Sequence, residues 1–485
     1  MRLFLFILAA FSLSHTASAQ QPNNSFLVQI IVTYQEEDPL HPWLDLQPNA
    51  RYGYGVVIDA NRVLTTEPLI RYNRHIELRR PTAGVKTTAS VVTSDPSAGL
   101  AILRTSNQDD LGGTRAIHIA KQVPLDASVK ILQLDGTSNL RNDNAHVLRA
   151  SVTSMPSSAN RRLLYSLLAS VAVNGPGAVV IYKGKLAGLV QDYHSGTRVA
   201  QMEPCTAINS FITDTKHSEY TGIASAGFTW STLVDPTKRR FLGIGENIGG
   251  VIVHACLPGS GAFDTLRPND VIIEWDGHVV DNLGFYNDRF YGRIEFTHLV
   301  NGTRQPNDVV PVTVVRDRRM VQAHVALSRQ LDRHLLIPEN VTDTPSPYLI
   351  SGGLVIRELS GKYIRAHGSD WRGSFNPRLA HMYLSGPQNN ACVNEHVVIL
   401  AGVLADPINI GYQHFSNELI THINDQPVLN INDVFRIVDA DDGLRSVRLK
   451  GIGVDLVLSE KNLKEADKRV AHTYRISNLR REATQ

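Results

Sequence analysis

The chain has 485 residues, of which 42% are hydrophobic and 19% are charged, and it carries a formal net charge of +2 at neutral pH. This composition is ordinary for globular proteins, and the length allows about two to four domains. The near balance of charge gives no support for nucleic-acid binding. Beyond the N-terminus, no run of apolar residues is long enough to cross a membrane. We therefore expect no nucleic-acid partner and no membrane span.

The N-terminus has the three parts of a secretory signal peptide. Arg2 is the basic residue, Leu3 to Leu13 is an apolar run too short for a membrane span, and Ala17-Ser18-Ala19 is a small-x-small cleavage site. A buried N-terminal helix is disfavoured because the run has no polar face. We expect residues 1–19 to be removed and the mature chain to be exported to the periplasm or another extracytoplasmic space.

Three cysteines lie far apart, at Cys205, Cys256 and Cys392, and show no metal-ligand spacing. An exported chain can form one disulfide and leave one thiol over. The separate apolar or loop context of each cysteine instead favours three small core residues. We expect no metal site and no cofactor.

The segment from Ser25 to about Thr213 alternates short apolar runs with turns and shows little helical periodicity. This pattern predicts an antiparallel barrel or sandwich. The runs GAVVIY and KLAGLV are joined through Lys183-Gly184, which predicts a β-hairpin.

Two later segments, residues 227–330 and 345–477, share one sequence pattern. Each has a strand, a turn, the signature N-x-(V/L)-I-x-x-(W/I)-(D/N)-(G/D)-x-(V/P)-V and a helix. The pattern indicates one module used twice, with a long insertion in the second copy.

The central segment resembles a PDZ domain of the type found in bacterial and organellar proteases. The run Phe241-Leu242-Gly243-Ile244 matches the carboxylate-binding loop, and Leu266 to Val280 matches the strand and turn before the groove helix. The resemblance implies that amides of the loop hold a terminal carboxylate and that the following strand accepts a peptide along a free edge. Since Leu242 and Ile244 would line an apolar pocket, hydrophobic C-termini are the expected ligands.

The first domain then resembles the trypsin-like domain of the HtrA/Deg family, in the two-PDZ branch known from plant organelles and bacteria. Pro42-Trp43 precedes GYGVVID, VLTTEPLI and GLAILRT in the family's order, and VLADPINIGY matches a motif of the second PDZ domain. The resemblance covers nearly the whole mature chain. It implies a mainly β fold, with a trypsin-like double β-barrel over residues 20–215 and two PDZ (α+β) domains over residues 227–330 and 345–477.

All three catalytic positions depart from the family. A serine protease needs a base beside its nucleophile and a carboxylate that orients the base. The resemblance places Pro68 at the base, Gly99 at the acid and Gly175 at the nucleophile. Pro176 also replaces a glycine of the nucleophile loop, which removes an amide hydrogen and restricts φ. The oxyanion donors are therefore expected to be lost with the nucleophile.

Nearby polar residues have structural explanations. His75 and His118 lie in predicted strands, and Ser166 and Ser170 lie on an apolar run. Asp95 begins an Asp-Pro turn, where aspartate commonly caps the backbone. We expect no catalytic residue, and an exported pseudoprotease that binds polypeptides or protein C-termini as a scaffold, adaptor or chaperone-like protein.

Two alternative functions stay open. One is a serine-type endopeptidase of the HtrA/Deg family with a rearranged active site. The other is a structural subunit of a mixed assembly with an active HtrA paralogue. The resemblance also implies a trimer-based homo-oligomer or such a hetero-oligomer. A fluorophosphonate probe, which labels only an activated serine, separates the endopeptidase from the other two.

The second PDZ-like segment is expected to bind peptides less well than the first. Its insertion, roughly residues 357–394, contains Tyr363, Trp371, Phe375 and Tyr383. Such aromatic side chains cover apolar surface, and the nearest candidate is the peptide groove of the same module. A surface elsewhere on the molecule is the alternative.

Overall fold

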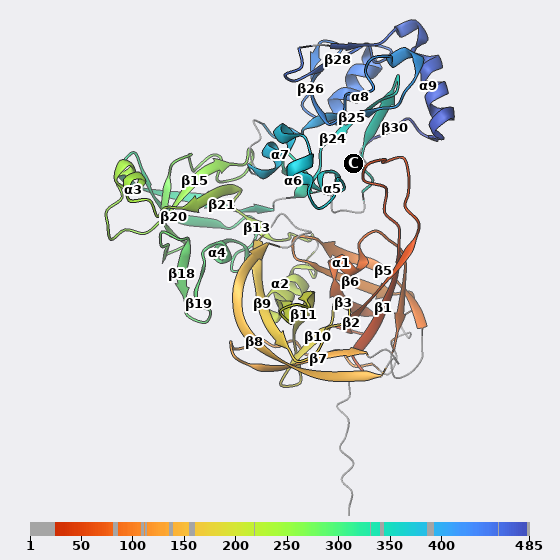
Figure 1. The fold of residues 1–485 in the computed structure, drawn as a ribbon. Coiled ribbons are helices and arrows are strands. Elements are labelled where there is room, and N and C mark those ends of the chain that lie inside the picture. The colour runs from red at the N-terminus through yellow and green to blue at the C-terminus, as the bar shows by residue number, and fades with distance from the viewer. Residues whose placement is uncertain are drawn as a thin grey trace, which may run out of the picture.

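The computed structural model describes residues 25–482 except 81–85, 108–110, 112–113, 135–138, 155–160, 218, 330, 340–343, 386–391 and 454. The expected signal peptide, residues 1–19, lies outside the described residues. Within them, no helix combines the length and the apolar character that a membrane span requires. Figure 1 shows two barrels side by side, with two smaller units above and beside them.

Each barrel is a closed sheet of six antiparallel strands. The first has the order β1-β2-β3-β6-β5-β4 and consists of β1 (Leu27–Tyr34), β2 (Asn49–Val57), β3 (Arg62–Thr66), β4 (Asn73–Arg79), β5 (Lys86–Asp95) and β6 (Leu100–Thr105). The second has the order β10-β11-β12-β9-β8-β7 and consists of β7 (Ser128–Leu134), β8 (Leu140–Ser154), β9 (Arg161–Ala169), β10 (Val179–Tyr182), β11 (Lys185–His194) and β12 (Val199–Pro204). Helix α1 (Glu67–Ile70) follows β3, and α2 (Cys205–Asp214) follows β12. The predicted hairpin at Lys183-Gly184 joins β10 to β11 and is confirmed.

Apolar side chains at alternate positions along the strands fill the interiors of the barrels. In β1, the alternate residues Val28, Ile30 and Val32 are fully buried inside the first barrel. A larger apolar cluster spans the junction of the barrels, where Tyr54 of β2 packs with residues of the second barrel. The amide of Leu134 donates to the Tyr54 hydroxyl group (3.0 Å). The two barrels are therefore joined by a packed apolar seam.

Two α+β units follow, and they share one strand order. The first unit (residues 224–329) contains β14 (Phe228–Thr232), β15 (Val251–Cys256), β16 (Val271–Trp275), β17 (His278–Val279), β20 (Val309–Arg316) and β21 (Arg319–Ala326). The second unit (residues 348–481) contains β24 (Leu354–Glu358), β25 (Val398–Val403), β26 (Glu418–Ile423), β27 (Gln426–Pro427), β28 (Ser446–Leu449) and β29 (Asp455–Val457). The orders β14-β15-β16-β20-β21 and β24-β25-β26-β28-β29 correspond strand by strand. A β-bulge also falls at the same place in both, between Thr229 and Trp230 and between Val355 and Ile356.

The remaining elements distinguish the two units. The first adds β13 (Ala224–Ser225) paired with β22 (Ser328–Arg329), the hairpin of β18 (Phe285–Asp288) and β19 (Gly292–Glu295), α3 (Pro236–Leu242) and α4 (Thr297–Asn301). The second adds β23 (Tyr348–Ser351), β30 (Arg480–Arg481), α8 (Ile431–Ala440) and α9 (Glu460–Tyr474), with a one-turn 3-10 helix at Pro407–Asn409. Its insertion forms α5 (Gly361–Arg365), α6 (Trp371–Ser374) and α7 (Pro377–Leu384). Another one-turn 3-10 helix, Asp332–His334, lies in the segment between the two units.

The insertion covers one face of the second unit's sheet. Its residues Tyr363 and Trp371 are buried together with Ile399 of β25. The next residue, Leu400, is buried with Val434 of α8. Because successive residues of a strand point to opposite faces, the insertion and α8 lie on opposite sides of the sheet. The expectation that the insertion covers the groove beside α8 is therefore wrong, because its aromatic side chains find apolar surface on the other face.

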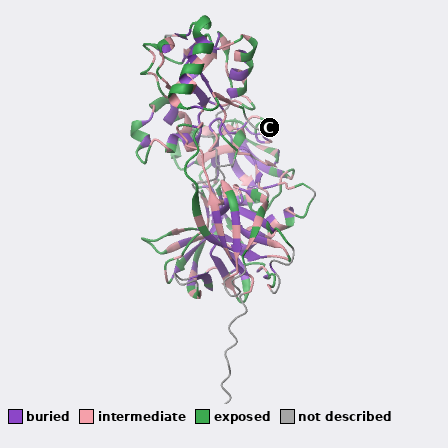
Figure 2. Cartoon of the chain, turned by 90° about the vertical axis from the view of Figure 1, so that its right-hand side faces the viewer, coloured by how far each residue is buried: buried purple, intermediate pink, exposed green. Residues whose placement is uncertain are grey.

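Both units are held against the barrels. In the first, Arg161 of β9 pairs with Glu295 (2.7 Å), and the Tyr165 and Tyr291 rings lie edge to face. In the second, Arg481 pairs with Glu37 of the loop between β1 and β2 of the first barrel (2.9 Å). Figure 2 shows buried residues concentrated inside the barrels and inside each unit, with intermediate burial common where they meet.

The three cysteines are free thiols. Cys205 is buried, as expected of a small core residue, whereas Cys256 and Cys392 are only half-buried. A disulfide among the three is therefore not formed.

Candidate functional site

The segments that hold the three predicted catalytic positions, Pro68, Gly99 and Gly175, meet beside β2. The amide of Glu67, at the start of α1, donates to the carbonyl oxygen of Gly99 (2.9 Å). On the other side of α1, a Cβ atom at Gly53 would lie 2.6 Å from Leu69 and 2.5 Å from the Pro176 carbonyl oxygen. Only a glycine at position 53 allows α1 and the loop before β10 to approach β2 so closely.

The base position, Pro68, lies in the first turn of α1 and has no group that can take up a proton. Its carbonyl oxygen accepts a hydrogen bond from Nη1 of Arg51 (2.7 Å). The neighbouring Glu67 is buried and accepts from Nε of Arg71 (2.8 Å). The polar groups around Pro68 thus hold α1 in place.

The acid position, Gly99, has a left-handed backbone (φ 65), and its carbonyl oxygen accepts from the Gln191 side chain (2.8 Å). A Cβ atom here would lie 2.2 Å from Nη2 of Arg162. Arg162 comes from β9 and pairs with Glu203 of β12 (Nε to Oε2, 2.7 Å), and both side chains are buried. Burial raises the pKa of the Glu203 carboxyl group, and the Arg162 guanidinium opposes that rise. A guanidinium group therefore fills the space in which a side chain at position 99 would begin.

The nucleophile position, Gly175, also has a left-handed backbone (φ 86), and a Cβ atom there would lie 2.9 Å from the Tyr52 carbonyl oxygen. In the same loop, Pro176 has no amide hydrogen. The amide of Asn174 donates to the Gln133 side chain (2.8 Å), and that of Gly177 donates to a carbonyl oxygen of β11 (2.9 Å). These amide groups are engaged in the fold rather than directed at a substrate oxygen.

The other polar residues singled out in the sequence are not brought together. His75 and His118 are exposed on separate segments, and Ser166 is buried with its hydroxyl group 3.4 Å from Gln201. Asp95 is buried and accepts from the amide of Ser97 (2.7 Å), so its predicted capping role is confirmed. Within the described ranges, no cluster of three histidine, cysteine or acidic residues is placed to hold a metal ion.

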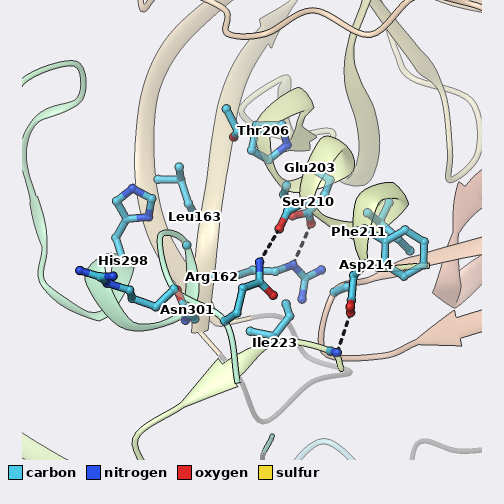
Figure 3. Close-up of a pocket in the computed structure, with 18 of the residues that line it drawn as sticks. Arg162, Leu163, Glu203, Thr206, Ser210, Phe211, Asp214, Ile223, His298 and Asn301 are labelled. Atoms are coloured by element: carbon cyan, nitrogen blue, oxygen red, sulfur yellow. Dashed lines mark hydrogen bonds and ion pairs between the residues drawn. The ribbon is translucent and has the colours of Figure 1, made fainter. Parts of the chain in front are cut away.

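A small pocket lies beside Arg162, between α2 and the first unit (Figure 3). Its charged groups are satisfied within the protein. Arg162 pairs with Glu203, and Asp214 accepts from the amide of Gly222 (2.8 Å). Buried His298 lines the side formed by the first unit. The cavity volume of about 70 Å³ has room for a few water molecules but not for a peptide. The pocket is therefore a joint between the second barrel and the first unit.

The expected carboxylate-binding loop is the end of a helix. Asp235 caps α3, Pro236 occupies its first turn, and Gly243 ends it with a left-handed backbone (φ 76). Phe241 lies in the last turn with 74% of its surface exposed. The strand that follows, β15, is paired with β14 on one side and with β16 on the other. The expectation of a free edge at β15 is wrong, because residues 228–232 form a further strand there.

The open edge of the first unit belongs to β14. The Gly227 carbonyl oxygen accepts from the amide of Leu257, so Gly227 points toward β15 (2.7 Å). Backbone groups of successive strand residues point to alternate sides, so those of Phe228 and Trp230 point away from β15. Val253, opposite Trp230, accordingly directs both its amide and its carbonyl oxygen toward residues 269–270 beside β16. Among the strands of the described chain, none pairs with this side of β14.

Sequence reasoning missed β14, although a signal for it was present. Gly227 directly precedes Phe228, the first residue of β14, just as Gly353 directly precedes Leu354, the first residue of β24, and both glycines have left-handed backbones (φ 73 and φ 80). In the second unit the corresponding edge is closed. Residues Tyr348 to Ser351 of β23 pair with residues Leu354 to Arg357 of β24, and β30 pairs with β23.

Comparisons with known proteins agree with this architecture. Residues 337–482 match the PDZ domain family. The chain is 24% identical over 433 residues to Protease Do-like 2, chloroplastic, of Arabidopsis thaliana, covering 87% of this chain and 70% of that relative. It is also 24% identical over 455 residues to Protease Do-like 4, mitochondrial, of the same plant, covering 93% and 83%.

Among solved structures, a variant of the HtrA-type protease AlgW with a decapeptide shares the fold over 64% of this chain and 96% of its own, with a TM-score of 0.51 and 17% identity. The match to the PDZ domain family covers the second unit, and the AlgW match shows the fold alone. Over most of its length the chain is therefore similar to HtrA/Deg proteases, and it combines a trypsin-like double β-barrel with a PDZ domain at its C-terminal end.

Proposed function

We propose that the chain is an exported pseudoprotease that binds polypeptides or protein C-termini and acts as a scaffold, adaptor or chaperone-like protein. The observation that carries this proposal is the composition of the catalytic region. Pro68, Gly99 and Gly175 offer no base, no acid and no nucleophile where the family has its triad.

The surroundings of these positions support the same conclusion. Arg162 occupies the volume beside Gly99, and the Tyr52 carbonyl oxygen lies against Gly175. Single substitutions would therefore not return the catalytic groups to their places. The named relatives are proteases, which is the ground for the alternative of an endopeptidase with a rearranged site. The hydroxyl group of Ser166, however, is close to Gln201 rather than to a base.

We propose that polypeptides bind at β14 of the first unit. Its outward backbone groups at Phe228 and Trp230 can extend the sheet onto a peptide strand by β-augmentation. The AlgW variant was solved with a decapeptide, which supports peptide binding by proteins of this architecture. Hydrophobic C-termini stay the expected ligands. Export rests on the N-terminal sequence, and trimer-based or mixed assembly rests on the family resemblance.

The direct test uses the mature chain, residues 20–485, with a fluorophosphonate probe and with casein as an unfolded substrate. We expect no labelling and no cleavage above background, because the serine hydroxyl groups have no general base to activate them. The double variant Ser166→Ala, Ser170→Ala is the control for an unrecognised nucleophile. Cleavage that co-elutes with the protein would contradict the proposal, and its loss in the double variant would identify the nucleophile.

A second test rebuilds the triad with Pro68→His, Gly99→Asp and Gly175→Ser. We expect this variant to stay inactive and to be less stable, because both glycines have positive φ and both new Cβ atoms meet neighbouring atoms. Gly184→Ala is the matched control, since Gly184 has φ 77 but open space around its Cβ position. Gly175→Ala should lower the free energy of unfolding by at least about 1 kcal/mol more than Gly184→Ala. Equal losses, or activity in the triple variant, would show that the site tolerates a triad.

A further inference from the structure

Helix α3 and the hairpin between β20 and β21 form one surface at the outer end of the first unit. We call this surface, residues 234–248 and 316–320, the α3 tip. Arg318 of the hairpin donates to the Phe241 carbonyl oxygen (3.3 Å), and its side chain lies against Gly243. Figure 1 shows α3 at the left-hand extremity of the molecule, on the side of the unit away from the barrels.

The α3 tip exposes large apolar side chains. Phe241 has 74% and Met320 has 68% of its surface exposed. Met320 is the cross-strand neighbour of Val315, which packs near Leu242 in a small core cluster. Since cross-strand neighbours share a face, Met320 lies on the same side of the sheet as α3. An exposed phenylalanine and methionine on one protruding surface mark a contact site rather than a stabilising feature.

Cationic side chains surround these apolar groups. Lys238, Arg240, Arg318 and Arg319 are all exposed, and the described part of the chain provides no ion pair for them. Two other arginines of the tip serve the fold instead. These are Arg316, which pairs with Asp270 (2.6 Å), and Arg239, which donates to the Gly245 carbonyl oxygen (2.9 Å).

The acidic groups of the α3 tip are fewer than its cationic groups. They are Asp235, Glu246 and Asp317. Asp235 lies at the start of α3, where its side chain accepts from the amide of Thr237 (2.8 Å). The exposed charge of the tip is therefore predominantly positive.

We propose that the α3 tip binds the surface of an anionic lipid bilayer. Phe241 and Met320 would enter the boundary between head groups and acyl chains, while the lysine and arginine side chains stay at the level of the phosphates. This mode needs no shaped pocket, whereas a protein partner would require a fitted, desolvated contact centre. The proposal is independent of the catalytic positions, and it describes peripheral contact rather than a membrane span.

The test is co-sedimentation of the mature chain with vesicles. One set contains about one third phosphatidylglycerol in phosphatidylcholine, and the other contains phosphatidylcholine alone. We expect binding to the anionic vesicles to be at least about ten-fold stronger and to weaken as salt is added. The variant Phe241→Ser, Met320→Ser and the variant Arg240→Glu, Arg319→Glu should each lose at least about ten-fold in binding.

Two matched control variants make the same kinds of substitution at exposed positions outside the α3 tip. Ile410→Ser removes an apolar side chain that is 77% exposed on the second unit. Lys130→Glu, Lys185→Glu reverses two exposed cations on the second barrel and alters the net charge by the same amount. Both controls should bind vesicles like the parent chain. Circular dichroism and the unfolding midpoint check that each variant is folded.

Three results would overturn the proposal. The first is equal binding to the two kinds of vesicle, and the second is an equal loss in the control variants. The third is a change of oligomeric state in light scattering for the tip variants with vesicle binding unaltered, which would make the α3 tip a contact between copies of the chain.

Discussion

The two α+β units share a strand order, but the outer edge of the first strand is open in the first unit and covered in the second. In the first unit, β14 ends the sheet, and the backbone groups of Trp230 face outward. In the second, the corresponding strand β24 has β23 beside it and β30 beyond. The capacity of such a module to accept a peptide strand therefore depends on what lies beside its edge, more than on the module's own sequence.

Strand β23, which covers the edge of β24, is held in place by α9 and β30, two elements that the first unit lacks. Tyr348 and Ile350 of β23 are buried against Val470 of α9. The Tyr348 hydroxyl group donates to the carbonyl oxygen of Asn478, close to β30 (2.7 Å). Asp467 of α9 accepts from the backbone just after β23 (2.6 Å). The C-terminal helix and strand thus fix β23 in the position that a bound peptide would take.

The largest expected difference between the units is how far a proline lowers the free energy of unfolding at equivalent positions, Trp230 in the first unit and Ile356 in the second. Ile356→Pro should lower the free energy of unfolding by about 3 kcal/mol more than Ile356→Val, because β24 lies between two paired strands. At Trp230, the free energy of unfolding of the proline variant should be lower than that of Trp230→Val by less than about 1 kcal/mol, because the Trp230 amide faces outward. Chemical denaturation with hydrogen exchange over each unit measures both. Equal additional costs would show that β14 is not an open edge.

Peptide binding gives the next largest contrast. Trp230→Pro should bind peptides with hydrophobic C-termini at least about ten-fold more weakly than Trp230→Val, because it lacks one donor of the new ladder. Fluorescence anisotropy on the mature chain measures the affinity, and Ile356→Val is the control for the covered edge. The contrast between the units would be refuted if Trp230→Pro kept full affinity or if Ile356→Val lost it.

The two units should respond to pH in opposite directions. Burial lowers the pKa of His298, with Asp288 opposing, so its stabilising effect is present above the ordinary value of 6.5 and is lost as the pH falls. Burial also acts to lower the pKa of His396, but its contacts with Glu358 outweigh this and raise it. That stabilising effect is present below 6.5 and is lost as the pH rises through the higher, folded value.

Hydrogen exchange at about pH 5.5 and about pH 7.5 measures this difference. After correction for intrinsic exchange rates, acid should weaken protection in the first unit around α4 and strengthen it in the second unit around β24. The variants His298→Gln and His396→Gln should each flatten the response of their own unit. A change of the same sign in both units would contradict the assignment.

The smallest effect is expected from the ion pair that ties β30 to α8. Arg480 contacts Asp439 (2.9 Å), and both side chains are partly exposed to solvent. Arg480→Ala should therefore lower the stability of the second unit by less than about 1 kcal/mol and should leave its edge closed. If this variant gained peptide binding in the second unit, β30 rather than β23 would be the element that closes the edge.

The sequence predicted the fold of the domains better than it predicted which sheet edges are open. The repeated signature led to two units with one strand order, because alternating apolar residues and turn residues act locally. The helix over Pro236–Leu242 was missed because a four-residue match outweighed helix signals at both ends. Those signals were the cap Asp235 with Pro236 at the start and Gly243 at the end.

Other features depend on contacts between distant parts of the chain. Arg162 fills the space beside Gly99 from a strand more than sixty positions away in the sequence, and nothing around either residue indicates that they meet. The closure of β24 similarly requires α9 and β30, which come about a hundred residues later. Such pairings follow from tertiary packing, which a local pattern does not encode.

The joint between the first barrel and the second unit also sets an order of events during folding. Glu37 accepts hydrogen bonds from the amide of Ser346 (3.0 Å) and from Arg481 (2.9 Å). The second contact joins residues 444 positions apart. Since domains form as units from the N-terminus and distant contacts close late, the barrels should fold while the carboxylate of Glu37 is still hydrated. Translation must pass Arg481 before this joint can close, so nascent chains halted upstream of Arg481 should carry a second unit that is not yet anchored.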